Sequence, residues 1–200
     1  MIKALIFYVG GVITKTDWKL AYTSFANAAG IPPEAVIDFH QTLMNQLLMG
    51  EMSFMSDFVK AMHAHTNKEA EELKTIWVDE ISKLVKINVE LLKIIDGLRK
   101  RYKLLVLSNL TESRLMIDEK LDLYSHFDQV FLSYKEHLKK PDEKFYRLAL
   151  AAAKAEPAEA VFIDDTELHV AAAQEIGIHG IVYTDNASLK TDLSKLGISL

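Results

Sequence analysis

Residues 3–14, KALIFYVGGVIT, run from an unbroken apolar segment into a glycine turn. The apolar part is rich in Leu, Ile and Phe without alternation, which is typical of a parallel strand covered on both faces. It stops at Tyr8, and Gly10 and Gly11 follow. A strand that ends in a tight glycine turn presents one side chain and several backbone N–H groups at the carboxyl edge of a sheet, where open α/β folds place their chemistry. The stretch therefore predicts a central parallel strand with a functional turn behind it.

Beyond residue 100, apolar runs of strand length alternate with segments of helical length. We expect strands at 103–107, 129–132, 160–163 and 180–183, and helices at 112–121, 143–154, 167–176 and 188–196. Strands that alternate with helices in this way predict a parallel sheet wound with right-handed crossovers. The expected fold class is therefore α/β, with a Rossmann-like parallel sheet as its core.

The stretch between the first two strands is too long for a simple crossover connection. Its apolar residues recur at helical spacing, and we expect helices at 16–29, 33–50, 53–62, 67–84 and 88–101. Ser53 and Asn67 are the expected caps of the third and fourth of these helices. We therefore predict an inserted α-helical cap at residues 16–86, with the core formed by residues 1–15 and 87–200.

The composition excludes several classes of protein. Half of the 200 residues are hydrophobic, so the chain can bury a sizeable core, and it has no cysteine for a disulfide, a thiolate zinc site or a nucleophile. The net charge is −5 and the basic residues are spread along the chain, which argues against nucleic acid as a partner. The longest apolar runs are too short to cross a membrane, and the chain starts in a strand with no basic and apolar leader. We therefore expect a cytoplasmic protein.

Polar side chains follow three further strands near the points where these strands end. Ser108 and Asn109 end the second strand, Lys140 precedes a proline after the third, and Asp164 and Asp165 end the fourth. Each has a local explanation, since the first pair can begin a turn and the aspartates can cap the next helix. Together, a hydroxyl, an ammonium and two carboxylates at one sheet edge suit a divalent cation and a phosphoryl group.

The order and spacing of these motifs resemble the haloacid dehalogenase (HAD) superfamily of Mg-dependent phosphohydrolases across essentially the whole chain. The resemblance rests on the first strand with its GGV turn, the Ser-Asn strand end, the Lys-Pro-Asp motif before a helix, and the Ile-Asp-Asp strand end. The helical insertion is similar to the cap of one branch, which includes small-sugar phosphatases and the phosphatase domain of soluble epoxide hydrolases. This resemblance implies a HAD-like core and a small phosphorylated metabolite as substrate.

The resemblance also implies a role for each candidate site residue. Asp165 would bind Mg²⁺ directly, Asp164 would support it from behind, and the backbone carbonyl of Gly10 would complete the protein ligands. The phosphoryl oxygens would be held by Ser108, Asn109, Lys140 and the backbone amides of the turn at Gly10 and Gly11.

Tyr8 stands where the family carries its nucleophilic aspartate, which also binds the metal. A phenol with an ordinary pKa of about 10 is protonated at neutral pH, reaches farther than a carboxylate and brings no formal charge to a cation. A buried aromatic plug is therefore a better interpretation of Tyr8 than a catalytic phenol. Removing a nucleophile from a cooperating catalytic set costs on the order of a millionfold in rate. We expect turnover that is lost or very low, and weakened Mg²⁺ binding.

Several functional hypotheses stay open from the sequence. The chain is a phosphohydrolase by descent that Tyr8 has inactivated, or a pseudoenzyme that works as a ligand-binding or protein-interaction module. Alternatively, Tyr8 is a cloning or sequencing change, since Asp and Tyr codons differ by one base, and the natural protein is active. A 2-haloacid dehalogenase is a weaker alternative, because a hydroxyl, an ammonium and two carboxylates suit metal and phosphate better than a halocarboxylate.

Overall fold

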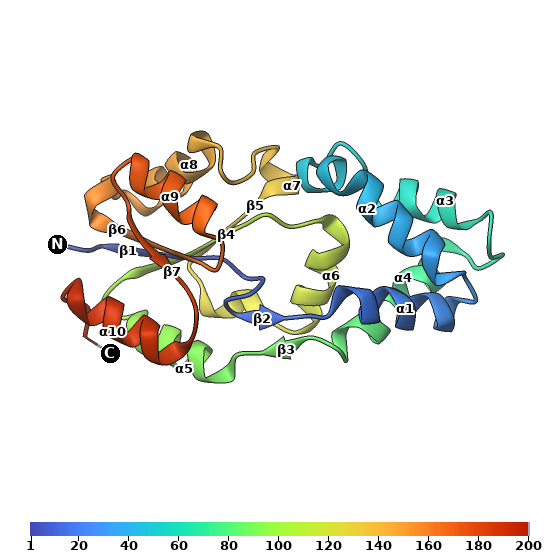
Figure 1. The fold of residues 1–200 in the computed structure, drawn as a ribbon, viewed down its shortest axis with the longest axis horizontal. Coiled ribbons are helices and arrows are strands. Elements are labelled where there is room, and N and C mark those ends of the chain that lie inside the picture. The colour runs from blue at the N-terminus through green and yellow to red at the C-terminus, as the bar shows by residue number, and fades with distance from the viewer. Residues whose placement is uncertain (200) are drawn as a thin grey trace.

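The structure is a computed structural model that describes residues 1–199. Its core is a parallel sheet in the strand order β5-β4-β1-β6-β7 (Figure 1). The strands are β1 Ala4–Phe7, β4 Lys103–Ser108, β5 Gln129–Leu132, β6 Ala160–Asp164 and β7 His179–Val182. The predicted α/β class with a Rossmann-like parallel sheet is confirmed, and β1 is the central strand.

Helices cover both faces of the sheet (Figure 1). Helices α5 Val89–Leu98 and α10 Asn186–Lys195 pack on one face, and α8 Glu143–Ala153 and α9 Glu167–Glu175 pack on the other. Shorter elements complete the core: α6 Glu112–Lys120, α7 Ser133–Glu136, and the 3₁₀ turns η2 Leu123–His126 and η3 Pro157–Glu159.

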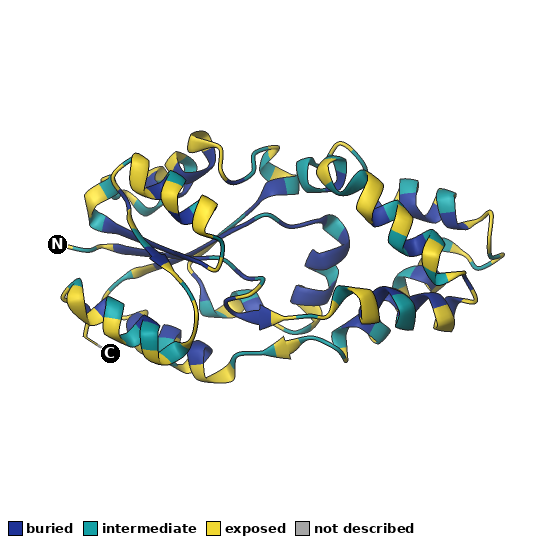
Figure 2. Cartoon of the chain, viewed as in Figure 1, coloured by how far each residue is buried: buried dark blue, intermediate teal, exposed yellow. Residues whose placement is uncertain are grey.

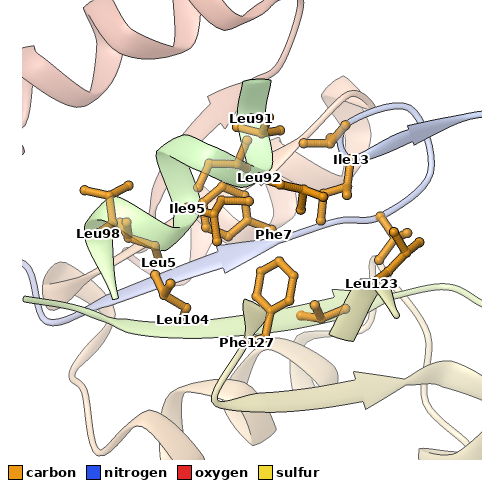
Figure 3. Close-up of a cluster of buried hydrophobic side chains, with 14 of the residues drawn as sticks. Leu5, Phe7, Ile13, Leu91, Leu92, Ile95, Leu98, Leu104, Leu123 and Phe127 are labelled. Atoms are coloured by element: carbon orange, nitrogen blue, oxygen red, sulfur yellow. The ribbon is translucent and has the colours of Figure 1, made fainter. Parts of the chain in front are cut away.

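Strand β1 explains why its apolar run does not alternate. Leu5 and Phe7 point into the cluster beneath α5 and α10, which Figure 3 shows in close-up. Ala4 and Ile6 point into the cluster beneath α8 and α9. Each face of the strand is fully buried, so apolar residues are favoured at every position. The burial of all four side chains fixes β1 in the middle of the sheet and Tyr8 at its carboxyl edge.

The segment after β1 forms a helical layer beyond the carboxyl edge of the sheet (Figure 1). It contains α1 Trp18–Ala29, α2 Pro33–Met49, the π-helical turn η1 Phe54–Phe58, α3 Val59–Met62 and α4 Ala70–Ser82. Ser53 caps η1 as predicted, through its side chain and the backbone N–H of Ser56. The prediction that Asn67 caps the next helix is wrong, because α4 begins three residues later with Glu69 at its N-cap position.

A small antiparallel ribbon, which the sequence analysis missed, links this layer to the core. Strands β2 Thr14–Lys15 and β3 Lys86–Ile87 pair with Thr14 opposite Ile87. Two-residue strands leave no periodic pattern in a sequence, so they escape detection there. The ribbon lies at both ends of segment 16–86. The division into a cap at 16–86 and a core at 1–15 and 87–200 stays a prediction.

Helix α6 ties the helical layer to the core. Its Ile117 is buried within the hydrophobic cluster of the layer, and much of the helix is buried (Figure 2). The indole Nε1 of Trp77 donates a hydrogen bond of 3.0 Å to the backbone carbonyl of Ser113. Glu112 accepts from the Ser53 hydroxyl at 2.8 Å and from the Phe54 N–H at 2.7 Å. Buried packing and directed hydrogen bonds therefore hold the layer in one position over the sheet edge.

Across residues 1–199, none of the helices combines the length and the apolar character that a membrane-spanning segment requires.

Candidate active site

Tyr8 lies directly at the end of β1, where its backbone N–H donates to the carbonyl of Ile163 at 2.9 Å. Its ring lies against Lys140, with the ammonium nitrogen 3.5 Å from the ring centroid. The Lys140 side chain has no exposed surface. An ammonium held against the face of an aromatic ring gains cation–π attraction in place of lost hydration. The Tyr8 ring therefore covers the lysine on one side.

Asp164 covers the same lysine from another direction. Its Oδ2 lies 2.5 Å from the Lys140 ammonium, and both side chains are completely buried. Oδ1 accepts from the Thr166 N–H at 2.9 Å and lies 3.3 Å from His169 Nδ1. Burial alone raises the pKa of Asp164, but the His169 hydrogen bond and the Lys140 charge outweigh it, and the pKa lies below its usual value. Both carboxylate oxygens are thus engaged within the protein.

The environment of Lys140 also changes its acidity. Burial lowers the pKa of its ammonium to about 8, although the neighbouring Asp164 opposes this shift. Asn109 holds the same residue through the main chain, because its side-chain oxygen accepts from the Lys140 N–H at 2.7 Å and its Nδ2 donates to the Lys140 carbonyl at 3.0 Å. Asn109 therefore positions Lys140, and both of its polar atoms already have partners.

The hydroxyl of Ser108 is buried and unpaired. This residue ends β4 with no exposed surface, and its Oγ has no hydrogen-bond partner among residues 1–199. A buried hydroxyl without a partner costs free energy, so such groups usually serve a ligand or a water. The position suits a donor to a phosphoryl oxygen.

The glycine turn is shaped by its neighbours. Gly11 has φ +80°, and a Cβ there would lie 1.9 Å from Asp165 Oδ2, so the carboxylate packs directly on the turn. A Cβ on Gly10 would lie 2.8 Å from the Tyr8 hydroxyl. The tyrosine hydroxyl therefore occupies space that a side chain at position 10 would need. Gly11 is favoured by its left-handed backbone, and a side chain at either glycine would displace a neighbouring side chain.

A cavity of about 1030 Å³ lies between the sheet edge and the helical layer. Six of the predicted site residues line it, namely Tyr8, Gly10, Gly11, Ser108, Asn109 and Asp165. Lys140 and Asp164 do not belong to this wall. The structure therefore brings six of the predicted residues together around one cavity, but it places Lys140 against the Tyr8 ring, paired with the buried Asp164.

Arg114 is a cavity residue that the sequence analysis missed. Its guanidinium bonds Asp118 at 2.5 Å, the Thr14 hydroxyl at 2.9 Å and the Thr16 hydroxyl at 3.2 Å. It also lies 5.4 Å from the centroid of the Trp18 ring. The spacing of Arg114 and Asp118 on a predicted helix was a signal for an i,i+4 pair. The threonine contacts, however, come from 98 and 100 residues away, which no local pattern reports.

The residues at this edge fit a phosphoryl group better than they fit Mg²⁺. No group of three or more His, Cys, Asp or Glu side chains that could hold a metal occurs within residues 1–199. Asp165 is the carboxylate on the cavity wall, and burial together with the Asp164 charge raises its pKa. Tyr8 adds no charge, because burial and then the two aspartates raise the pKa of its hydroxyl far above neutral. One carboxylate and a backbone carbonyl form a weak donor set for a hard divalent cation.

Comparison with known proteins identifies the family. A model of hydrolases, described as haloacid dehalogenase-like hydrolase, matches residues 2–177. The chain therefore belongs to the haloacid dehalogenase-like hydrolases, as the motifs had indicated.

Two characterised relatives refine this placement. A flavin mononucleotide hydrolase of Arabidopsis thaliana is 36% identical over 85 residues, which cover 42% of this chain and 35% of the relative. The bifunctional epoxide hydrolase 2 of Sus scrofa is 28% identical over 225 residues, which cover all of this chain and 40% of the relative. The matched segments thus span less than half the length of either relative.

Solved structures confirm the fold. A HAD family enzyme of Bacteroides thetaiotaomicron superposes with a TM-score of 0.74 at 23% identity, covering 93% of this chain and 94% of the other. That enzyme has also been crystallised in complex with magnesium and inorganic phosphate. The same architecture therefore holds both ligands in a relative that is distant in sequence.

Proposed function

We propose that this chain is a phosphohydrolase of the HAD superfamily by descent, acting on a small phosphorylated metabolite, whose form with Tyr8 turns over its substrate very slowly or not at all. The observation that carries the proposal is the position of Tyr8. It stands at the end of the central strand, where the motif order places the nucleophile, and its ring lies 3.5 Å from the Lys140 ammonium. The similarity to a flavin mononucleotide hydrolase supports the class of substrate.

Tyr8 blocks turnover in two ways. The neutral phenol is a poor nucleophile, since burial and the nearby aspartates disfavour its ionised form. Its ring also lies between the cavity and the Lys140 ammonium, which would otherwise stabilise charge on a phosphoryl group. Both effects lower the rate without disturbing the fold, because Tyr8 packs well against the surrounding residues.

The test measures p-nitrophenyl phosphate hydrolysis with and without MgCl₂. We expect no turnover by the protein with Tyr8 and restored, Mg²⁺-dependent turnover by Tyr8→Asp, in which a second carboxylate is available to metal and phosphate. Tyr8→Asn is the matched control, because it has the same size as aspartate but no nucleophilic carboxylate, and it should stay inactive. Turnover by the Tyr8 protein at rates typical of phosphatases would refute the argument about the nucleophile.

A second candidate is a pseudoenzyme that binds a ligand without converting it. The size of the cavity favours this alternative, because about 1030 Å³ remain open beside a Tyr8 ring that covers the lysine. An inactive Tyr8→Asp variant with an intact fold would favour it further, since other parts of the catalytic set would then also be lost. Resequencing the source gene tests the remaining alternative, that Tyr8 is a cloning or sequencing change. An Asp codon at position 8 would exclude the pseudoenzyme and indicate an active natural protein.

A further inference from the structure

The cavity has a charge that differs from that of the rest of the protein. Its wall carries three basic side chains, Lys15, Lys19 and Arg114, and one carboxylate, Asp165. The chain as a whole has a net charge of −5. His40 lies on the cavity wall in the helical layer, but it adds no positive charge there. Burial lowers its pKa to about 4, so it is neutral at pH 7. A net positive cavity in an acidic protein concentrates anions at this place.

The two lysines are available to a ligand. Lys15 and Lys19 are exposed, and the ion pairs found within residues 1–199 involve other side chains. Arg114 differs from them, because Asp118, Thr14 and Thr16 already hold its guanidinium. Arg114 holds Thr14 and Thr16 in place at the cavity wall, and the two lysines supply the unpaired positive charge.

Another part of the wall is apolar. Ile37, Met44 and Leu48 lie on one face of α2, at spacings of seven and four residues, and all three line the cavity. Trp18 and Tyr22 add aromatic surface from α1, with their ring centroids 5.5 Å apart. Tyr22 is buried, but Trp18 and the three α2 residues are only partly buried, which leaves apolar surface facing the cavity. Binding pockets for small organic molecules have this character.

We propose that the cavity binds a small amphipathic organic anion, such as an aromatic or aliphatic carboxylate or sulfonate, with its anionic group at Lys15 and Lys19 and its apolar body against α2 and the aromatic side chains of α1. The inference rests on the proposed function in one respect, namely that Tyr8 keeps the Lys140 ammonium covered. The ligand therefore needs no phosphoryl group, and its anion lies on the side of the cavity that the ribbon and α1 form.

The test is a calorimetric titration of the full chain at pH 7.5 and low salt with naphthalene-2-sulfonate, compared with uncharged 2-naphthol. We expect saturable binding at one site, with the sulfonate binding about tenfold more tightly than the naphthol, as two exposed charges allow. Raising the salt concentration should remove most of this difference and leave naphthol binding unchanged.

Two double variants locate the charge. Lys15→Gln with Lys19→Gln should lose the tenfold preference for the sulfonate. Lys93→Gln with Lys100→Gln is the matched control, because both lysines are exposed, lie on and just beyond α5, and do not line the cavity. Leu48→Trp should weaken both ligands by filling the cavity, and its unchanged thermal midpoint would show that it folds.

Three results would overturn the proposal. They are the absence of saturable binding, equal affinity for sulfonate and naphthol, and displacement of the sulfonate by inorganic phosphate at 10-fold excess, which would place the anion in the phosphate site. None of them depends on turnover. Conversely, an inactive Tyr8→Asp variant would contradict the proposed function and leave the sulfonate titration unaffected.

Discussion

The stability of this protein should fall in mild acid because of one buried histidine in the helical layer. His40 is 2% exposed and stacks on Trp77 with ring centroids 5.1 Å apart and on Tyr22 at 4.5 Å. Its Nδ1 lies 2.9 Å from the Val36 carbonyl, to which it donates. Burial lowers its pKa to about 4, although the bond to the Val36 carbonyl opposes the shift. The imidazole is therefore neutral in the folded protein at pH 5.

The magnitude follows from the difference between the folded and unfolded pKa. An unfolded histidine titrates near about 6.5, so below that pH the unfolded chain binds a proton that the folded chain does not. The contribution of the neutral His40 to the free energy of unfolding is therefore complete above about pH 7, and it is lost as the pH falls toward 4. With the folded pKa at about 4, the free energy of unfolding should fall by roughly 2 kcal/mol between pH 8 and pH 5 because of His40 alone.

Urea denaturation at pH 8 and pH 5 measures this loss. His40→Phe keeps the aromatic packing and should abolish roughly 2 kcal/mol of the pH dependence. His65→Phe changes an exposed histidine and should keep the wild-type dependence. If His40→Phe and the wild type lose the same free energy between the two pH values, the argument from burial is wrong.

Three further substitutions test the candidate site and the contact between the helical layer and α6. Lys140→Met leaves a buried carboxylate without its cation and should cost roughly 3–5 kcal/mol in urea unfolding, whereas Lys135→Met at an exposed position should cost far less. Trp77→Phe removes the indole donor to α6 and should cost at least about 1–3 kcal/mol, and an unchanged midpoint would contradict the role of this contact. Gly11→Ala should lower the thermal midpoint more than Gly30→Ala. Both glycines have positive φ, but only the Cβ at position 11 would meet a neighbour, at 1.9 Å, so equal shifts would refute the clash.

Local patterns in the sequence were strong enough to predict most of the core. The unbroken apolar run of β1 indicated a strand with two buried faces, and the alternation after residue 100 indicated the parallel sheet. The polar strand ends then had to meet at one edge, since parallel strands share the direction of their carboxyl ends. By contrast, Asn67 was the wrong cap, because a capping residue type alone does not decide which of several candidate positions starts a helix.

By itself, then, the sequence determined the fold class, the family and the replacement of the expected nucleophile by Tyr8. Only the tertiary structure decided that the Tyr8 ring lies over Lys140, that Asp164 forms a buried ion pair with the same lysine, and that Arg114 joins α6 to the ribbon. Periodicity and strand ends are local properties that a chain displays in one dimension. Which side chain covers which charge depends on packing between segments up to 100 residues apart, and that packing exists only in the folded protein.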